Sequence, residues 1–369
     1  MTRLAELQSA QVGLTDVRVT HLGLGGGALG GFFETVSEDA AVGAVERAYE
    51  LGVRYFDTAP LYGHGRSEER LGRALAGIKR DDFVLSTKVG VRIDPRRAGA
   101  PEIEARYADP FLLDGGYDFS YDGCLRSLEA SMGRVGTDRI DIVYIHDPDE
   151  ADSALPLSLR SGADHFGEAM DGAYRALDEL RAQGVIGAVG VGLNGTEMLV
   201  RFAGAGSFDC FLLAGRYTLL QQNGLDDLLP LCVDQGISIV VGGVFNSGIL
   251  ATGTGAAAPK YDYREADPGT LARVRRIEAL CGEHGISLTA AALQFPLAHE
   301  AVVSVIPGVR DAVEVEQDVD GAVAPIPVEF WSALADRGLV DRRAVERRLM
   351  PPAAGHSRPS MHATTAEEG

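Results

Sequence analysis

Short apolar runs alternate along the chain with segments whose apolar positions recur at helical spacing. Eight runs have the length and composition of β-strands, at 17–24, 54–59, 83–89, 140–146, 188–193, 210–217, 238–245 and 302–307. Several are almost continuously apolar, as in 140–145 and 237–241. Strands that are buried on both faces have this pattern, so the sequence predicts a parallel sheet covered by helices.

The segments between the runs have helical patterns. In 38–51, Val42, Val45 and Tyr49 share one face, Ser37 is placed to cap the first turn, and Gly52 follows the end. Similar patterns predict helices around 125–132, 174–180, 270–281 and 289–298, and a last helix with Pro327 in its first turn.

Eight strands, each followed by a helix, predict an α/β protein with a single (β/α)8 TIM barrel over residues 1–349. A doubly wound open sheet is the alternative, but the glycines in 25–31 lack the GxGxxG spacing that would open a helix there. We expect that loop to pass close to a ligand or to another loop; a glycine-rich turn without function stays the alternative.

Two segments fall outside the repeat. Residues 92–119 form a long segment after the third predicted strand, where barrels often shape the substrate pocket. Residues 350–369 are rich in Pro, Ala, Ser and His and are predicted to be a disordered tail.

Composition narrows the class of protein. The formal net charge of −19 argues against nonspecific binding to nucleic acid or to an anionic membrane. No stretch approaches the roughly 20 apolar residues that cross a bilayer, and the first residues lack a signal-peptide core, so we expect a cytoplasmic protein. The four cysteines form no CxxC pair and are predicted to be reduced core thiols. The sequence is compatible with a monomer and with a homo-oligomer.

Polar residues end three successive predicted strands. They are Asp57, Lys88 and His146, and Tyr62 follows Asp57 by five residues. Reactive groups of a barrel lie at the carboxyl ends of its strands. Because these three strands are neighbours, we expect the four side chains to converge.

Physical chemistry gives the four residues distinct tasks. Asp57 and Lys88 would form an ion pair, since an unpaired buried charge is unfavourable. Lys88 would then lower the pKa of Tyr62 from its ordinary value of about 10, which suits Tyr62 to general acid/base catalysis. His146 would hydrogen-bond the substrate oxygen. A purely structural ion pair is one alternative. A metal site formed by Asp57, His64, His146 and Asp147 is another, although HxH and HExxH spacings are absent and Lys88 would repel a cation.

A local motif makes the hypothesis specific. The segment GVRYFDTAPLYG at 52–63, followed by SEERLG at 67–72, closely resembles the signature GxRxxDTAxxYG…SExxLG of the aldo-keto reductase family. The resemblance spans roughly residues 15–345. It implies a (β/α)8 barrel and an NAD(P)-dependent oxidoreductase in which Asp57, Tyr62, Lys88 and His146 form the catalytic tetrad, with Tyr62 as the general acid/base.

The resemblance also implies where the cofactor lies. It assigns the nicotinamide to Asn194, Arg216 and Phe245, the pyrophosphate to a loop with Ser247, Gly248 and Leu250, and the adenosine to Gly308, Arg310, Gln317 and Asp318. Gly192 and Leu193 replace the serine that often contacts the carboxamide. For Gln317 and Asp318, a solvated helix face is the alternative.

The cofactor and the substrate class follow from finer resemblances. Pro307-Gly308 replaces the Lys-Ser of many NADPH-dependent members, and Arg310 alone is a weak phosphate clamp, so NAD is favoured and NADP is the alternative. The segments 61–68, 213–220, 246–250 and 259–263 resemble the branch of D-threo-aldose (L-fucose) and pyridoxal 4-dehydrogenases. That branch implies a small carbonyl or sugar substrate oxidised as a cyclic hemiacetal. A general aldehyde reductase and a non-catalytic, cofactor-binding regulatory subunit remain alternatives.

Overall fold

Eight parallel strands form the centre of the molecule. The computed structural model of the chain describes residues 7–95, 113–149 and 164–349. Its main sheet contains, in spatial order, β3 (Leu24–Gly25), β4 (Tyr55–Asp57), β5 (Val84–Val89), β8 (Ile142–His146), β9 (Ala188–Leu193), β10 (Cys210–Ala214), β13 (Ser238–Gly242) and β16 (Val302–Ile306). Every neighbouring pair is parallel. Bridges from Leu22 to Val305 and from Gly25 to Gly308 join the last strand to the first, so the sheet closes into the predicted (β/α)8 barrel.

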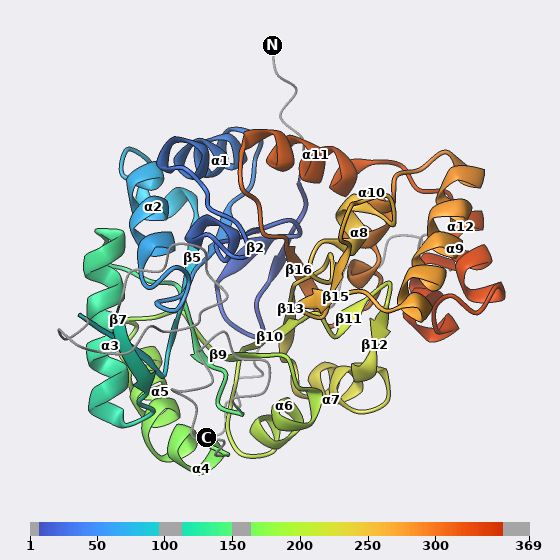
Figure 1. The fold of residues 1–369 in the computed structure, drawn as a ribbon. Helices are drawn as coiled ribbons and strands as arrows, with labels where there is room; N and C mark the ends of the chain where they lie inside the picture. The colour runs from blue at the N-terminus through green and yellow to red at the C-terminus, as the bar shows by residue number, and fades with distance from the viewer. Residues whose placement is uncertain (1–6, 96–112, 150–163, 350–369) are drawn as a thin grey trace, which may run out of the picture.

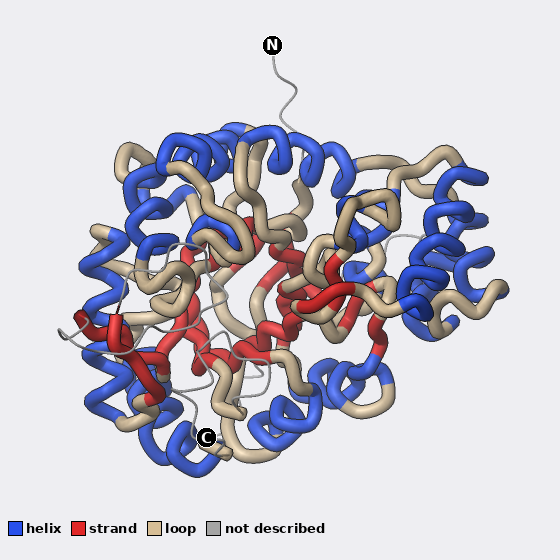
Figure 2. The backbone as a smooth tube through the Cα atoms, in the orientation of Figure 1, coloured by secondary structure: helices blue, strands red, loops and turns tan. Residues whose placement is uncertain are grey.

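Helices surround these strands, as the chain colours of Figure 1 and the element colours of Figure 2 show. The ring contains α1 (Glu38–Glu50), α2 (Arg66–Leu75), α3 (Tyr121–Val135), α5 (Arg175–Ala182), α6 (Thr196–Ala203), α7 (Leu228–Gln235), α10 (Leu288–Gln294) and α11 (Ala312–Val323). Shorter pieces are α4 (Phe166–Glu168), α8 (Ile249–Thr252) and α13 (Glu346–Leu349). On the right of Figure 1, α9 (Pro268–His284) and α12 (Val328–Asp336) pack against each other outside the ring.

The helix boundaries follow the predicted signals closely. Ser37 accepts a hydrogen bond from the amide of Ala40 and starts α1 at Glu38. The predicted place of Pro327 is wrong by one position, because it precedes α12 as the N-cap residue instead of lying within the first turn. Its fixed φ still suits an extended residue at that boundary.

The first predicted strand is two elements. Arg18–Thr20 forms β2, which pairs antiparallel with β1 (Ser9–Gln11), and only the later β3 joins the barrel. Val12 and Val19 from this hairpin pack inside the barrel and fill its amino-terminal end. The long segment at 92–119 is also more ordered than predicted, because β6 (Val91–Pro95) and β7 (Leu113–Tyr117) form a hairpin; residues 96–112 lie outside the described part, as does the predicted tail at 350–369.

Two predicted strands end earlier than expected. β10 stops at Ala214 because Gly215 has a φ of 69°, and β13 stops at Gly242 because Gly243 has a φ of 56°. Both conformations are left-handed and end an extended strand. The residues that follow therefore form the loops above the barrel.

Strand side chains alternate between two packing layers. Tyr55, Tyr144 and Cys210 pack inside the barrel, whereas Phe56 and Val143 pack against the helices. Residues two positions further along each strand share its inward face. This alternation directs the polar residues at the strand ends into the barrel mouth.

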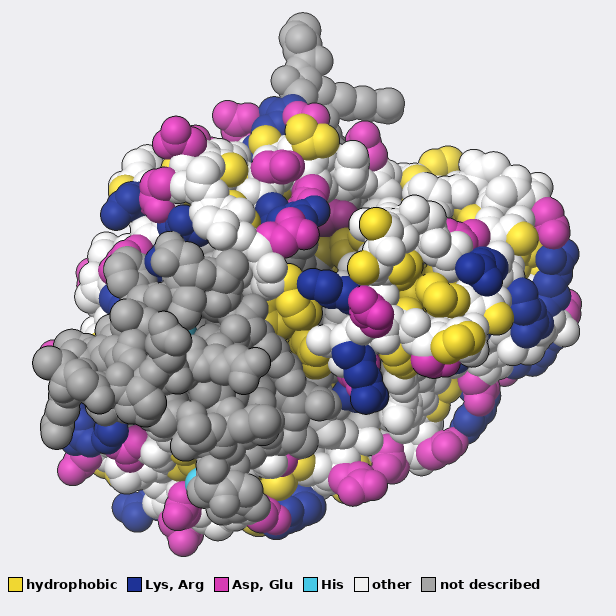
Figure 3. All heavy atoms as spheres, in the orientation of Figure 1, with side chains coloured by type: hydrophobic (Ala, Val, Ile, Leu, Met, Phe, Trp, Pro, Cys, Tyr) yellow, Lys and Arg dark blue, Asp and Glu magenta, His cyan; other side chains and the backbone are white. Residues whose placement is uncertain are grey.

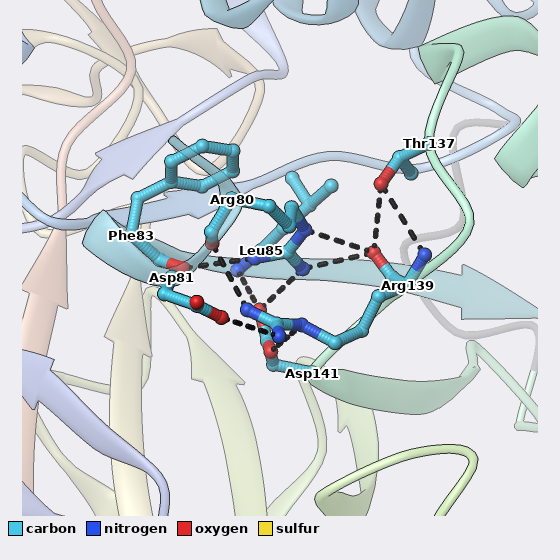
Figure 4. A network of polar contacts seen from close by, with 7 residues as sticks. All are labelled: Arg80, Asp81, Phe83, Leu85, Thr137, Arg139 and Asp141. Atoms are coloured by element: carbon cyan, nitrogen blue, oxygen red, sulfur yellow. Dashed lines mark hydrogen bonds and ion pairs between the residues drawn. The ribbon is translucent and has the colours of Figure 1, made fainter. Parts of the chain in front are cut away.

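Charged groups clamp the amino-terminal ends of β5 and β8 (Figure 4). Arg80 contacts Asp141 at 2.6 Å, and the same carboxylate accepts the amide of Leu85 at 2.8 Å. Arg139 contacts Asp81 at 2.7 Å and donates to the carbonyl of Arg80 at 2.9 Å. The cluster thus fixes the backbone just before both strands.

Candidate active site

A buried ion pair lies at the carboxyl end of the barrel. Lys88 Nζ is 2.9 and 2.7 Å from the two carboxylate oxygens of Asp57 and 2.9 Å from the carbonyl oxygen of Thr58. Both charged side chains are only 1% exposed. The predicted pairing of Asp57 with Lys88 is therefore present in the structure.

Burial and pairing act in opposite directions on these two groups. Burial raises the pKa of Asp57 and lowers the pKa of Lys88, while their mutual attraction limits both shifts. Nζ meets three acceptors, and only a protonated ammonium has three hydrogens to give them. We therefore infer that the pair is ionised.

Tyr62 lies beside this ammonium. Lys88 Nζ is 4.7 Å from the centroid of the Tyr62 ring, and the rings of Tyr62 and His146 meet edge to face with centroids 5.9 Å apart. The glycine-rich loop passes directly under this turn, since a Cβ on Gly30 would lie 2.5 Å from the carbonyl carbon of Tyr62. The loop thus passes close to another loop, which was one of the two expectations.

His146 is neutral in this environment. Burial, with a further contribution from Lys88, lowers the pKa of His146 well below its ordinary value. Its Nδ1 is buried and has no hydrogen-bond partner among the described residues, and its Nε2 is 3.8 Å from a carboxylate oxygen of Asp147. A buried N–H without an acceptor is the more costly arrangement, so we place the proton on Nε2, where it can be donated to a substrate oxygen.

A cavity of about 580 Å³ opens above these residues and extends to α11. Its lining includes most of the predicted site: Asp57, Tyr62, Lys88, His146, Asn194, Arg216, Phe245, Ser247, Gly248, Gly308, Arg310, Gln317 and Asp318. Figure 3 views this face, and apolar side chains gather around its middle. Leu250 is the exception, because α8 lays its apolar side on the core and Leu250 is fully buried there, away from the cavity.

A hairpin that the sequence did not predict crosses the cavity. β14 (Lys260–Tyr261) and β15 (Arg264–Glu265) flank a tip at Asp262 and Tyr263, both with positive φ. Three polar contacts attach the tip to predicted cofactor residues: Arg216 to Asp262 at 2.9 Å, Asn194 to the Tyr263 hydroxyl at 3.0 Å, and Ser247 to the Tyr263 amide at 2.9 Å. Residues 260–265 have no helical or strand periodicity, so the resemblance of segment 259–263 to a branch of the family was the only sequence feature that pointed to it.

Two further lining residues were not assigned to the catalytic or cofactor site from the sequence. Phe32 follows the glycine-rich loop, and its ring meets Tyr263 edge to face at 5.9 Å. Asp147 follows His146 in a left-handed conformation with a φ of 47° and is buried. A non-glycine residue in that region at a site is a recognised sign of functional constraint, but dihedral angles cannot be read from sequence.

The far end of the cavity is rich in carboxylates. Arg310 donates from Nε to Glu314 at 2.9 Å and also pairs with Glu34. Asp318 is buried, and burial, reinforced by Glu314, raises its pKa to about 8. The cation at this end is thus already neutralised by the protein's own acids.

Within 7–95, 113–149 and 164–349, no group of three or more His, Cys, Asp or Glu side chains is arranged to hold a metal ion. In the same residues, no helix has both the length and the apolar character needed to span a membrane.

Comparison with known proteins gives consistent relationships. The model of the Aldo/keto reductase family matches residues 21–336. The chain is 40% identical over 339 residues to the pyridoxal 4-dehydrogenase of Microbacterium luteolum, covering 89% of this chain and 97% of that protein. It is 37% identical over 325 residues to a D-threo-aldose 1-dehydrogenase of Pseudomonas sp., covering 87% and 95%.

Solved structures resemble the fold. A glycerol dehydrogenase from Gluconobacter oxydans matches with a TM-score of 0.68 at 22% identity, over 95% of this chain and 99% of that one. An aldo-keto reductase from Bacillus halodurans, in its holo form, matches with a TM-score of 0.67 at 23% identity, over 96% and 99%. At these identities the likeness supports the barrel and nothing finer.

Proposed function

The chain belongs to the aldo/keto reductase family and is an oxidoreductase, and from that premise we propose that it oxidises a cyclic hemiacetal, an aldose or pyridoxal, to a lactone with NAD. One observation carries the proposal: the buried pair of Lys88 and Asp57 lies beside Tyr62 and His146 at the floor of a cavity of about 580 Å³. A cavity of that size accommodates a small-molecule ligand.

Tyr62 is proposed as the general base. It takes the proton of the hemiacetal hydroxyl while the hydride leaves the same carbon, which becomes the lactone carbonyl. Lys88 stabilises the phenolate through its positive field, since all three of its hydrogens are already donated to Asp57 and Thr58. His146 holds the reacting oxygen through Nε2–H. In the reverse direction Tyr62 returns the proton.

The cavity fits a dinucleotide cofactor. When bound, the nicotinamide ring accepts or supplies the hydride. The cavity extends from the tetrad to Asp318, a carboxyl that is only 6% exposed and lines the far end of the cavity. An adenine amino group would give that carboxyl a donor. Asn194, Arg216 and Phe245 would hold the nicotinamide end, and Ser247 with Gly248 would border the pyrophosphate.

NAD is proposed over NADP on electrostatic grounds. Arg310 is shared between the carboxylates of Glu314 and Glu34. A 2′-phosphate there would meet carboxylates instead of free cations. The hydroxyls of an unphosphorylated ribose can instead donate to those oxygens.

Aldoses and pyridoxal are the proposed substrates. The two relatives described above carry these activities in their names. An aromatic wall of Phe32 and Tyr263 faces the cavity, and Asp147 adds a carboxylate near the reacting end. Such a mixture suits a ring that has apolar faces and polar edges.

A spectrophotometric panel tests this function. Purified protein is mixed with NAD or NADP and with L-fucose, other aldoses, pyridoxal or simple aldehydes, and formation of the reduced cofactor is followed. We expect NAD reduction with one sugar or with pyridoxal, abolished in Tyr62→Phe and retained in Tyr217→Phe, a buried tyrosine outside the cavity lining. Reduction of simple aldehydes alone would instead assign a general aldehyde reductase. Cofactor binding without any turnover would favour the regulatory subunit.

A further inference from the structure

A second layer of polar side chains lies inside the barrel, directly below the candidate tetrad. Tyr55 precedes Asp57 by two residues, Ser86 precedes Lys88 by two, and Tyr144 precedes His146 by two. Alternation along a strand places both members of each pair on the inward face. None of these three side chains lines the cavity, so the proposed reaction does not contact them.

These side chains form one hydrogen-bonded chain that ends on Asp57. Ser86 Oγ is 2.7 Å from Asp57 Oδ1 and 3.1 Å from the Tyr55 hydroxyl. The Tyr55 hydroxyl is in turn 3.1 Å from the Tyr144 hydroxyl. Ser86, Tyr55 and Tyr144 are all fully buried, so bulk water does not compete for these contacts.

Counting hydrogens identifies the donor and the acceptor of each hydrogen bond in this series. An ionised Asp57 can only accept, so the single hydroxyl hydrogen of Ser86 is donated to it. Ser86 must then accept from Tyr55, and Tyr55, having given its one hydrogen, must accept from Tyr144. All three hydroxyl dipoles therefore point toward the carboxylate, and hydrogen bonds aligned in this way reinforce one another.

Neighbouring strands leave room for the two tyrosine rings. A Cβ on Gly190 would lie 2.6 Å from a ring carbon of Tyr144, and a Cβ on Gly23 would lie 2.8 Å from a ring carbon of Tyr55. Phenylalanine would fill the same space without burying a hydroxyl. Packing at these two positions therefore requires an aromatic ring but not a hydroxyl, and the hydroxyls serve the hydrogen bonds.

We propose that Ser86 and Tyr55 are positioning residues for proton transfer at Tyr62, because they hold Asp57 ionised and oriented and so keep the Lys88 ammonium beside the phenol. This inference rests on the proposed role of Tyr62. The other titratable groups that face the chain and the ion pair are Glu68 in α2, His146 and Asp147 at the end of β8, and Cys210 in β10.

The pH profile of turnover tests the proposal. In Ser86→Ala, Asp57 loses a hydrogen-bond donor and attracts the Lys88 proton more strongly. The positive electrostatic field of the Lys88 ammonium at Tyr62 therefore weakens. The limb of the kcat profile that reports the tyrosine base moves to higher pH by about half a unit to one unit. Turnover at neutral pH accordingly falls by about three- to tenfold and recovers at alkaline pH. Tyr55→Phe shifts the limb in the same direction by less, because it acts through Ser86.

Matched variants separate this role from packing. Tyr217 also has a buried hydroxyl, without a partner in the described residues, so Tyr217→Phe should leave the limb in place. The double variant Tyr55→Phe with Tyr144→Phe removes both tyrosine hydroxyls below Ser86 and tests the same role if Ser86→Ala does not fold. A purely structural role lowers kcat equally at every pH.

These outcomes distinguish a failure of the positioning role from a failure of the proposed function. If Tyr62→Phe abolishes the limb but Ser86→Ala and the double variant leave it unmoved, the positioning role is wrong and the proposed function stands. If Tyr62→Phe retains turnover with an unchanged limb, the proposed function itself is wrong. A shift in Ser86→Ala together with an unchanged Tyr217→Phe supports the proposal.

Discussion

The strand β5 has an ion pair at each end, Arg80 with Asp141 at the amino-terminal end and Lys88 with Asp57 of β4 at the carboxyl end. At the amino-terminal end, Arg80 and Asp141 are 20% and 14% exposed. At the carboxyl end, Lys88 and Asp57 are 1% exposed. One strand, β5, therefore has a partly hydrated ion pair at its start and a dry one at its end.

Their hydrogen bonds lead to different places. Asp141 accepts the amide of Leu85, and Arg80 donates to the carbonyls of Phe83 and Arg139, so this cluster is attached chiefly to backbone. The Lys88–Asp57 pair faces the cavity, and most of its contacts are between side chains. Barrels in general separate stability from chemistry along the strand axis. The comparison shows how residues of similar charge are assigned to one task or the other by burial and by their partners.

Removing the cation from the dry pair should have the largest effect. Lys88→Met leaves Asp57 buried and unpaired, so we expect a loss of about 3–5 kcal/mol in the free energy of unfolding and at least about a hundredfold loss of turnover. Denaturant unfolding and steady-state kinetics measure the two quantities. Adding Asp57→Asn should restore part of the stability and none of the activity.

Arg80→Met is the matched control at the other end of the strands. It should leave turnover per folded molecule near that of the unaltered protein, since Asp141 keeps the amide of Leu85. Equal losses of turnover in the Arg80 and Lys88 variants would remove the distinction between the two ends.

A smaller effect is expected from the acid of the amino-terminal cluster. Asp141→Ala removes acceptors from Arg80 and from the amide of Leu85, and should lower the free energy of unfolding by about 1–3 kcal/mol. Thermal or denaturant unfolding measures this change, and kcat serves as the control because the site lies at the opposite strand ends. A loss of activity larger than the loss of folded protein would contradict the account.

The dependence of stability on pH should also separate the two ends. Burial raises the pKa of Asp318 at the cavity to about 8, so the folded state holds a proton that the unfolded state has released above about pH 4. Its contribution to stability therefore falls as pH rises from about 4 to 8. At the amino-terminal end, Arg139 lowers the pKa of Asp81, and that contribution is lost as pH falls.

Measuring the free energy of unfolding of Asp318→Asn between about pH 4 and 8 tests whether the contribution of Asp318 to stability falls as pH rises. The variant should lack the decline in stability between about pH 4 and 8, although its absolute stability also includes the cost of a buried amide. An unchanged slope would mean that Asp318 is ionised in the folded state at neutral pH.

Much of the fold could be predicted because buried parallel strands have nearly continuous apolar sequences. All eight barrel strands lie within or at the edge of the predicted runs, although the first run also contained the β2 strand. The boundary between β2 and β3 was missed because Arg18–Thr20 and Leu24–Gly25 lie in one run of mixed polar and apolar residues. Only their different pairing partners, β1 for the first and β4 for the second, separate them.

The tetrad could be predicted for a different reason. Asp57, Lys88 and His146 end adjacent strands, so alternation and barrel closure alone bring them together. The sequence did not indicate that the side chain of Leu250 is buried away from the cavity, because its direction depends on how the short helix α8 packs. The hairpin tip at Asp262 and Tyr263 depends on positive φ angles and tertiary contacts, which no local pattern encodes.

The central claim is that Tyr62 moves the proton while a hydride leaves the substrate carbon. The most direct measurement uses the substrate found in the panel, deuterated at the reacting carbon, with the unaltered protein and with Tyr62→Phe. The account predicts deuterium in the reduced cofactor of the unaltered protein, and in Tyr62→Phe a loss of turnover of about 10²–10⁴-fold with cofactor binding retained. Turnover by Tyr62→Phe at the rate of the unaltered protein, or reduced cofactor without deuterium, would contradict it.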